Sequence, residues 1–344
     1  MFLADYRHFR LLTNGARHLI SWRSALHQGK KNWGQACVKA YEYLKNSYFD
    51  ILLERYLYGG IHMLFHEKEN IHVTQVTLKV MDMKRSLEFY TNIVGFQIWK
   101  ESGDAVYLSA EGGRPLLVLE EVRDVLPPNR KATGLYHYAL LLPEKADLAD
   151  LVKHLIKNNV QVASADHLVS EAIYFSDPEG NGIEVYIDRP SSLWEWSGSE
   201  VKMTVDPLDF EELFRFETNA GWMGLPARTV MGHIHLHVSD LEKTKQFYCD
   251  GLGFDVVSSL GVQALFISSA RYHHHIGLNT WKGIDAPVPE DQEAGLKWFD
   301  IHYPQNHSRN EAVHRIRQMG ASVEEKEGVI YTADPSKNGI RLLV

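Results

Sequence analysis

VTLKVMDMKRSLEFYTNIVGF (residues 76–96) returns as IHLHVSDLEKTKQFYCDGLGF (residues 234–254), and this repeat decides the fold. The residues of the first stretch with an identical counterpart 158 positions later include Asp82, Phe89, Tyr90, Gly95 and Phe96. A second related pair, FSDPEGNGIEVY (175–186) and TADPSKNGIRLL (332–343), closes each repeat. Self-similarity at a fixed spacing indicates duplicated structural units. The sequence therefore predicts two homologous halves, at residues 71–190 and 230–344.

Each half divides again into two units of similar pattern. Alternating strands such as VTQVTLKV and GHIHLHV precede short amphipathic helices, and further strands follow. The second unit of each half opens with YHYALLLP or KWFDIHYP, continues with a helix, and closes around an Asp-Pro turn. We expect an α+β fold of four βαβββ modules, near residues 71–121, 134–188, 231–281 and 295–344. Paired modules would enclose two barrel-like cavities.

The composition excludes several classes of protein. The chain has 344 residues, of which 44% are hydrophobic, and a formal net charge of −8, which gives no general attraction to nucleic acid or acidic membranes. No window is apolar enough to predict a membrane span. Cys37 and Cys249 are too few for a disulfide scaffold, so a reducing, cytoplasmic setting is expected. Phosphate-binding glycine motifs are absent from the sequence.

Residues 1–62 differ from the remainder in charge, with a net +5 against −13. A helix is expected from about Gln35 to Leu57, where apolar residues follow three-to-four spacing. The segment is interpreted either as a presequence or as an extension created by a mis-called start, with the native start near Met63. No chemistry is assigned to it.

The strings HLHVSDLEKTKQFYCDGLGF and YFSDPEGNGIEVY resemble the vicinal-oxygen-chelate superfamily, which includes glyoxalase I, fosfomycin-resistance proteins and type I extradiol dioxygenases. The resemblance covers nearly everything after residue 71, and the sequence as a whole is most similar to Bacillus-type catechol 2,3-dioxygenases. In this superfamily a residue on the first strand of a module and an acid on a last strand hold a metal. The first-strand positions here are Gln75, His137, His233 and Trp298.

The resemblance implies one metal site and a particular pairing of modules. The last-strand acid position holds Glu184 in module 2 but Arg341 in module 4, and a cationic side chain would oppose a metal ion. His137, Glu184 and His233 therefore remain as ligands, a set suited to Fe(II) and also accepted by Mn(II). For these three to converge, module 2 must pair with module 3, and module 1 with module 4.

Three further residues match family positions near the substrate. Tyr174 lies ten residues before Glu184, the spacing of a family tyrosine, and His167 matches a family loop histidine more loosely. The run His273–His275 contains the expected acid–base histidine; alignment of Gly277 favours His274, and the choice between His274 and His275 stays open. His235 and His237 are interpreted as structural.

The resemblance implies Fe(II)-dependent extradiol cleavage of catechol, or of a simple substituted catechol, by dioxygen to a 2-hydroxymuconate semialdehyde. No flavin or nicotinamide is expected, and assembly into a homo-oligomer is left open. One alternative is a glyoxalase-like lyase or isomerase that uses Gln75, His137 and Glu184. Another is a non-enzymatic protein that binds an aromatic ligand among its histidines.

Overall fold

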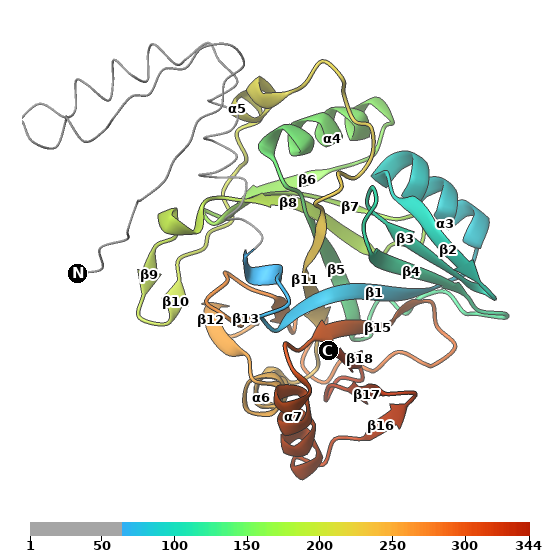
Figure 1. The fold of residues 1–344 in the computed structure, drawn as a ribbon, viewed down its shortest axis with the longest axis vertical. Coiled ribbons are helices and arrows are strands. Elements are labelled where there is room, and N and C mark those ends of the chain that lie inside the picture. Colours follow the sequence, from blue (N-terminus) through green and yellow to red (C-terminus); the bar gives the residue numbers. More distant parts are fainter. Residues whose placement is uncertain (1–63) are drawn as a thin grey trace, which may run out of the picture. The chain divides into compact units, whose positions relative to one another are not determined.

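The computed structural model describes residues 64–344 (Figure 1). The helix expected from Gln35 to Leu57, and the extension at residues 1–62, lie outside the described residues. Within residues 64–344, no helix is long and apolar enough to span a membrane.

The four predicted modules are present, which confirms the fold class. Module 1 contains β1 (His72–Val80), α3 (Met83–Phe89), the π-helical turn η3 (Tyr90–Val94), β2 (Gln97–Ser102), β3 (Ala105–Ser109) and β4 (Pro115–Glu121). Module 2 contains β5 (Gly134–Leu141), α4 (Lys145–Lys157), β6 (Ala163–Asp166), β7 (Ser170–Ser176) and β8 (Gly182–Asp188).

The second half repeats this order of elements. Module 3 contains β11 (Val230–His237), α6 (Leu241–Gln246), the π-helical turn η6 (Phe247–Leu252), β12 (Asp255–Leu260), β13 (Ala264–Ser268) and β14 (Ile276–Asn279). Module 4 contains β15 (Gly295–His302), α7 (Asn306–Gln318), β16 (Val323–Lys326), β17 (Val329–Ala333) and β18 (Gly339–Leu343).

Short elements precede module 1 and connect the halves. They are η2 (Leu64–His66), η4 (Ser191–Leu193), β9 (Trp196–Ser197), β10 (Glu200–Val201), α5 (Phe210–Leu213) and η5 (Phe214–Phe216).

Each large sheet takes its strands from both halves. One has the order β16-β17-β18-β15-β1-β4-β3-β2, and the other β12-β13-β14-β11-β5-β8-β7-β6. The antiparallel pairs β1–β15 and β5–β11 join the halves at the middle of each sheet (Figure 1). The predicted pairing of module 2 with module 3, and of module 1 with module 4, is therefore confirmed. We propose that the halves 71–190 and 230–344 are sequence repeats within one folding unit.

The repeated Asp and Tyr residues explain why the motif recurs. Asp82 and Asp240 cap the helices α3 and α6, each accepting a hydrogen bond from a backbone N–H three residues later. The Tyr90 hydroxyl donates to Asp177 at 2.8 Å, and the Tyr248 hydroxyl to Asp334 at 3.2 Å. Each tyrosine thus connects the first helix of a half to the Asp-Pro turn of its second module.

The predicted helices at these motifs differ from the observed ones in one respect. Each is a short α-helix continued by a π-helical turn, which ends at Gly95 or Gly253 with φ of 92° and 91°. A positive φ is readily adopted by glycine, which explains its place in the motif. Helices pack in pairs within a half, since Arg315 of α7 donates to the Gly251 carbonyl of η6 (Figure 1).

Candidate metal centre

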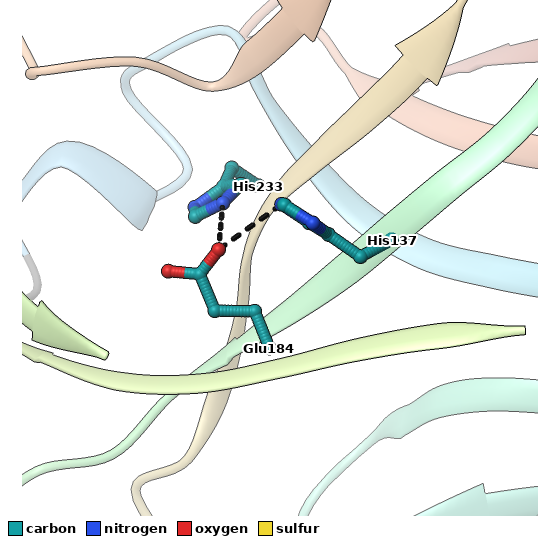
Figure 2. Close-up of side chains that lie close together, drawn as sticks. All are labelled: His137, Glu184 and His233. Carbon is teal, nitrogen blue, oxygen red and sulfur yellow. Dashed lines mark hydrogen bonds and ion pairs between the residues drawn. The ribbon is translucent and has the colours of Figure 1, made fainter. Parts of the chain in front are cut away.

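Three side chains predicted as metal ligands converge on one face of the second sheet (Figure 2). Ala139 on β5 pairs with Glu184 on β8 and with His233 on β11, which places these two residues in one row across three strands. His137 lies two residues before Ala139 and points to the same face. Their candidate ligand atoms all lie within 4.8 Å of one another. The register of β5 with its two neighbours therefore builds the cluster.

The cluster is buried, and its surroundings favour an ionised carboxylate. Glu184 Oε2 lies 3.0 Å from His137 Nε2 and 3.1 Å from His233 Nε2, and the three residues are 2%, 6% and 1% exposed respectively. Burial raises the pKa of Glu184, but the two imidazoles outweigh it and hold that pKa well below its usual value. Burial lowers the pKa of His233 despite the neighbouring carboxylate, which favours the neutral imidazole that a metal requires.

Unpartnered atoms at the cluster fit a cation. His137 Nε2 is buried and makes no well-formed hydrogen bond within residues 64–344. Buried polar atoms are normally hydrogen-bonded, so an orphan of this kind indicates a missing partner. Two imidazoles and one carboxylate form the donor set of mononuclear non-haem iron sites, and also accept Mn(II). The assignment of these residues as ligands stays a prediction, which the geometry favours.

In the other sheet, the positions that correspond to the ligand cluster are occupied by an ion pair. Arg341 donates to both carboxylate oxygens of Asp300, at 2.7 and 2.6 Å, and to Gln75 Oε1 at 3.1 Å. Trp298 lies beside it, its ring centroid 5.2 Å from the guanidinium carbon. Gln75 also donates to the Pro115 carbonyl, so its amide belongs to this sheet and not to the cluster around Glu184. The glyoxalase-like alternative, which needs Gln75, lacks this ligand.

Tyr174 and His167 form a hydrogen-bonded pair beside the cluster. Tyr174 on β7 pairs with Glu184 on β8, and its ring centroid lies 5.5 Å from that of His137. His167 Nδ1 contacts the Thr204 carbonyl at 2.6 Å, and its Nε2 contacts the Tyr174 hydroxyl at 2.6 Å. Since the carbonyl only accepts, a neutral His167 carries its proton on Nδ1 and accepts from Tyr174 through Nε2. Burial and the charge of Glu184 raise the pKa of Tyr174 well above its usual value.

His274 faces the cavity, and His275 does not. The ring of His274 lies 4.0 Å from that of His233 and also lines the large cavity. Burial lowers the pKa of His274 well below its usual value, which favours the neutral imidazole. His275 instead contacts the Phe65 carbonyl and Ser268. The three histidines precede β14, which begins at Ile276, so strand alternation does not determine which of them faces the cavity.

A cavity of about 1370 Å³ opens over the cluster. His137 and Glu184 lie on its wall with both predicted substrate-facing residues, Tyr174 and His167. His235 and His237, interpreted from the sequence as structural, also line it, because they alternate with His233 on the same face of β11. His237 contacts Asn279, and Asn279 donates to His235.

The sequence analysis missed residues on the opposite side of His233. Asp188 lies on the same face of β8 as Glu184, and its Oδ1 contacts His273 Nε2 at 2.7 Å. Tyr186, between them on that face, has its ring 5.0 Å from that of His233. A Cβ at Gly232 would lie 2.0 Å from the Tyr186 hydroxyl, which explains the glycine before His233. Alternate residues of a strand lie on the same face, so counting in steps of two from Glu184 would have placed Tyr186 and Asp188 on the face of the cluster.

Comparisons with known proteins agree with this architecture. The sequence profile of the Glyoxalase/Bleomycin resistance protein/Dioxygenase superfamily matches residues 72–185 and 230–334. A protein named catechol-2,3-dioxygenase from Bacillus subtilis (strain 168) is 42% identical over 271 residues, covering 78% of this chain and 95% of that protein. Metallothiol transferase FosB of Staphylococcus saprophyticus is 29% identical over 117 residues, 33% of this chain and 75% of its own length.

A solved structure supports the fold. The crystal structure described as a putative dioxygenase from Bacillus subtilis superposes with a TM-score of 0.59 at 15% identity, covering 79% of this chain and 84% of that chain. At this identity the likeness concerns the arrangement of the modules alone.

Proposed function

The chain belongs to the glyoxalase/bleomycin resistance protein/dioxygenase superfamily, and we propose that it is an Fe(II)-dependent extradiol dioxygenase acting on catechol or a simple substituted catechol. The observation that carries the proposal is the convergence of His137, Glu184 and His233 below a cavity that Tyr174 and His274 also line. The activity for which the 42% identical relative is named supports it. A cytoplasmic location and action without nucleic acid or membrane partners belong to the same proposal.

His137, Glu184 and His233 would hold the metal. When bound, Fe(II) would supply Lewis acidity that lowers the pKa of the catechol hydroxyls, and a place where diol and dioxygen meet. The buried carboxylate balances part of the metal charge, and the two neutral imidazoles add none. The choice of Fe(II) over Mn(II) is tested by the reconstitution experiment described below.

The side chains around the metal position would hold and move protons. His274 faces the cavity, and burial favours its neutral form, so it would accept a proton from a substrate hydroxyl and later return one to the product. The Tyr174 hydroxyl would hydrogen-bond a diol oxygen, while the His167 imidazole orients it through the 2.6 Å contact.

The proposed reaction balances without another redox partner. The ring carbon–carbon bond beside the diol breaks, and both atoms of dioxygen enter the 2-hydroxymuconate semialdehyde. The aromatic substrate supplies all four electrons that dioxygen accepts. A flavin or nicotinamide is therefore unnecessary to the chemistry proposed.

Anaerobic reconstitution tests this function. Purified chelator-treated protein is loaded with Fe(II) or with Mn(II), mixed with catechol and exposed to air, while the yellow ring-cleavage product and dioxygen uptake are recorded. We expect one dioxygen consumed per catechol with Fe(II), and loss of turnover in His137→Ala, Glu184→Ala and His233→Ala. His314→Ala, an exposed position on α7, is the matched control and should retain activity.

Other outcomes point to different parts of the proposal. Turnover with Mn(II) but not with Fe(II) would contradict the assignment of iron and leave the proposed reaction unchanged. If the protein binds one iron but forms no product from catechol or from simple alkyl- and halocatechols, the proposed substrate class is contradicted. An aromatic ligand that binds equally well to His233→Ala, without turnover, would favour the binding-protein alternative.

A further inference from the structure

A continuous line of hydrogen bonds runs from Asp188 through His273 to His274. Asp188 Oδ1 lies 2.7 Å from His273 Nε2, and His273 Nδ1 lies 2.8 Å from His274 Nδ1. The Asp188 side chain is 1% exposed and that of His273 is fully buried. We call these three residues the Asp188 relay. His274 alone of the three lines the cavity.

The positions of the protons follow from the chemistry of the groups. The Asp188 carboxylate can only accept, so His273 donates to it through Nε2–H. A neutral His273 then has its lone pair on Nδ1, and His274 must donate through Nδ1–H. The Nε2 atom of a neutral His274 therefore carries a lone pair, and it makes no hydrogen bond with residues 64–344.

We infer that Asp188 and His273 are positioning residues that hold His274 in the tautomer with a basic Nε2 directed at the substrate. This inference rests on the proposed function for its catalytic meaning, but the tautomer itself does not depend on turnover. The carboxylate comes from β8, four residues after Glu184, and the imidazole precedes β14. The arrangement thus links the last strand of module 2 to the acid–base side chain of module 3.

A purely structural network is the competing explanation. The Tyr272 hydroxyl also donates to Asp188 Oδ1 at 3.3 Å, and it contacts the Tyr186 hydroxyl at 2.6 Å. Asp188 Oδ2, however, has no hydrogen-bond partner among the described residues. A buried carboxylate with one unpaired oxygen is a poor stabilising element, because desolvation of the charge is only partly compensated. The Asp188 carboxylate is better explained by a role in fixing the tautomer of the neighbouring His273 than by a stabilising role.

The Asp188→Asn variant changes the proton pattern while keeping size and shape. The amide can donate to His273 Nε2, which moves the His273 proton to Nδ1 and forces the His274 proton onto Nε2. We expect kcat to fall about tenfold or more, within the range that general acid–base catalysis contributes, with KM nearly unchanged. Tyr272→Phe removes the 3.3 Å contact and keeps the relay, so it should retain near wild-type kcat.

A double-variant cycle separates the relay from a structural role. If Asp188 acts through His274, Asp188→Asn should lower kcat no further in a His274→Gln background. A structural role predicts that the two losses multiply. Equal kcat for wild type and Asp188→Asn, or multiplied losses, would overturn the inference.

Nitrogen-15 spectra of the metal-free protein provide a readout without activity. His274→Gln identifies the His274 ring signals, whose shifts distinguish a protonated from an unprotonated nitrogen. We expect Nδ1–H in wild type and Nε2–H in Asp188→Asn. A wild-type signal with Nε2–H would overturn the inference whatever the activity. The expected tautomer in a protein that fails to cleave catechol would uphold the relay and contradict the proposed function alone.

Discussion

Acid is expected to destabilise the folded protein through His72 on β1. This side chain is 6% exposed, and its Nδ1–H donates to the Asn70 carbonyl at 2.9 Å. Burial lowers its pKa to about 4, with a further contribution from neighbouring His302. The unfolded chain, in which the pKa is near its ordinary value of 6.5, therefore binds a proton more tightly than the folded one.

The sign and size of the effect follow from this difference in pKa. Stability from neutral burial of His72 is fully present above about pH 6.5 and is lost as the pH falls toward 4. Between pH 7 and pH 4 the loss amounts to about 3 kcal/mol. In His72→Gln, an amide can still donate to the Asn70 carbonyl but does not titrate, so this part of the loss should disappear.

Urea unfolding of the metal-free proteins at pH 7 and pH 4, followed by tryptophan fluorescence, measures the difference. Chelator removes metal binding as a second source of pH dependence. His314→Gln, exposed on α7, is the matched control and should lose as much stability as wild type. If the free energy of unfolding of His72→Gln falls as much as that of wild type between the two pH values, neutral burial of His72 is not a source of acid lability.

Three further variants test separate parts of the structure. Tyr90→Phe removes the 2.8 Å hydrogen bond to Asp177, whose Oδ2 keeps a 2.8 Å bond from the Asn181 amide, and should lower the free energy of unfolding by about 1 kcal/mol, measured by urea titration. Arg341→Met leaves the 3% exposed Asp300 carboxylate unpaired and should cost about 3–5 kcal/mol, most of it recovered when Asp300→Asn is added. Tyr174→Phe should lower kcat for catechol about tenfold while the protein still binds one iron, as steady-state kinetics and metal analysis would show; unchanged kcat would remove the phenol from the mechanism.

The predicted ligand cluster rests on the resemblance to the vicinal-oxygen-chelate superfamily, applied to the internal alignment that the repeat supplies. Gln75 and His233 lie at one repeat position and His137 and Trp298 at another, so the loss of ligands at Trp298 and Arg341 indicated the cross-half pairing. The sheet order confirms that pairing. The family pattern names the strand positions that carry ligands, and the internal alignment shows which modules keep ligand-type residues there.

The hydrogen bonds around His274 could not be predicted in the same way. His273 and Asp188 are 85 residues apart, and their contact depends on how β8 is placed relative to the segment that precedes β14, a strand that does not neighbour β8 in the sheet. The direction of each imidazole in the run His273–His275 depends on irregular backbone before β14, where strand alternation does not apply. Local pattern alone also missed the π-helical turns η3 and η6, because their apolar spacing is close to that of an α-helix.

We propose that His137, Glu184 and His233 build one metal centre across the two halves. Its most direct test is the amount of iron bound per chain after anaerobic loading and desalting, compared between wild type, His233→Ala and Gln75→Ala. We expect one iron per chain in wild type and in Gln75→Ala, and almost none in His233→Ala. Iron retained in His233→Ala but lost in Gln75→Ala would contradict the cross-half centre.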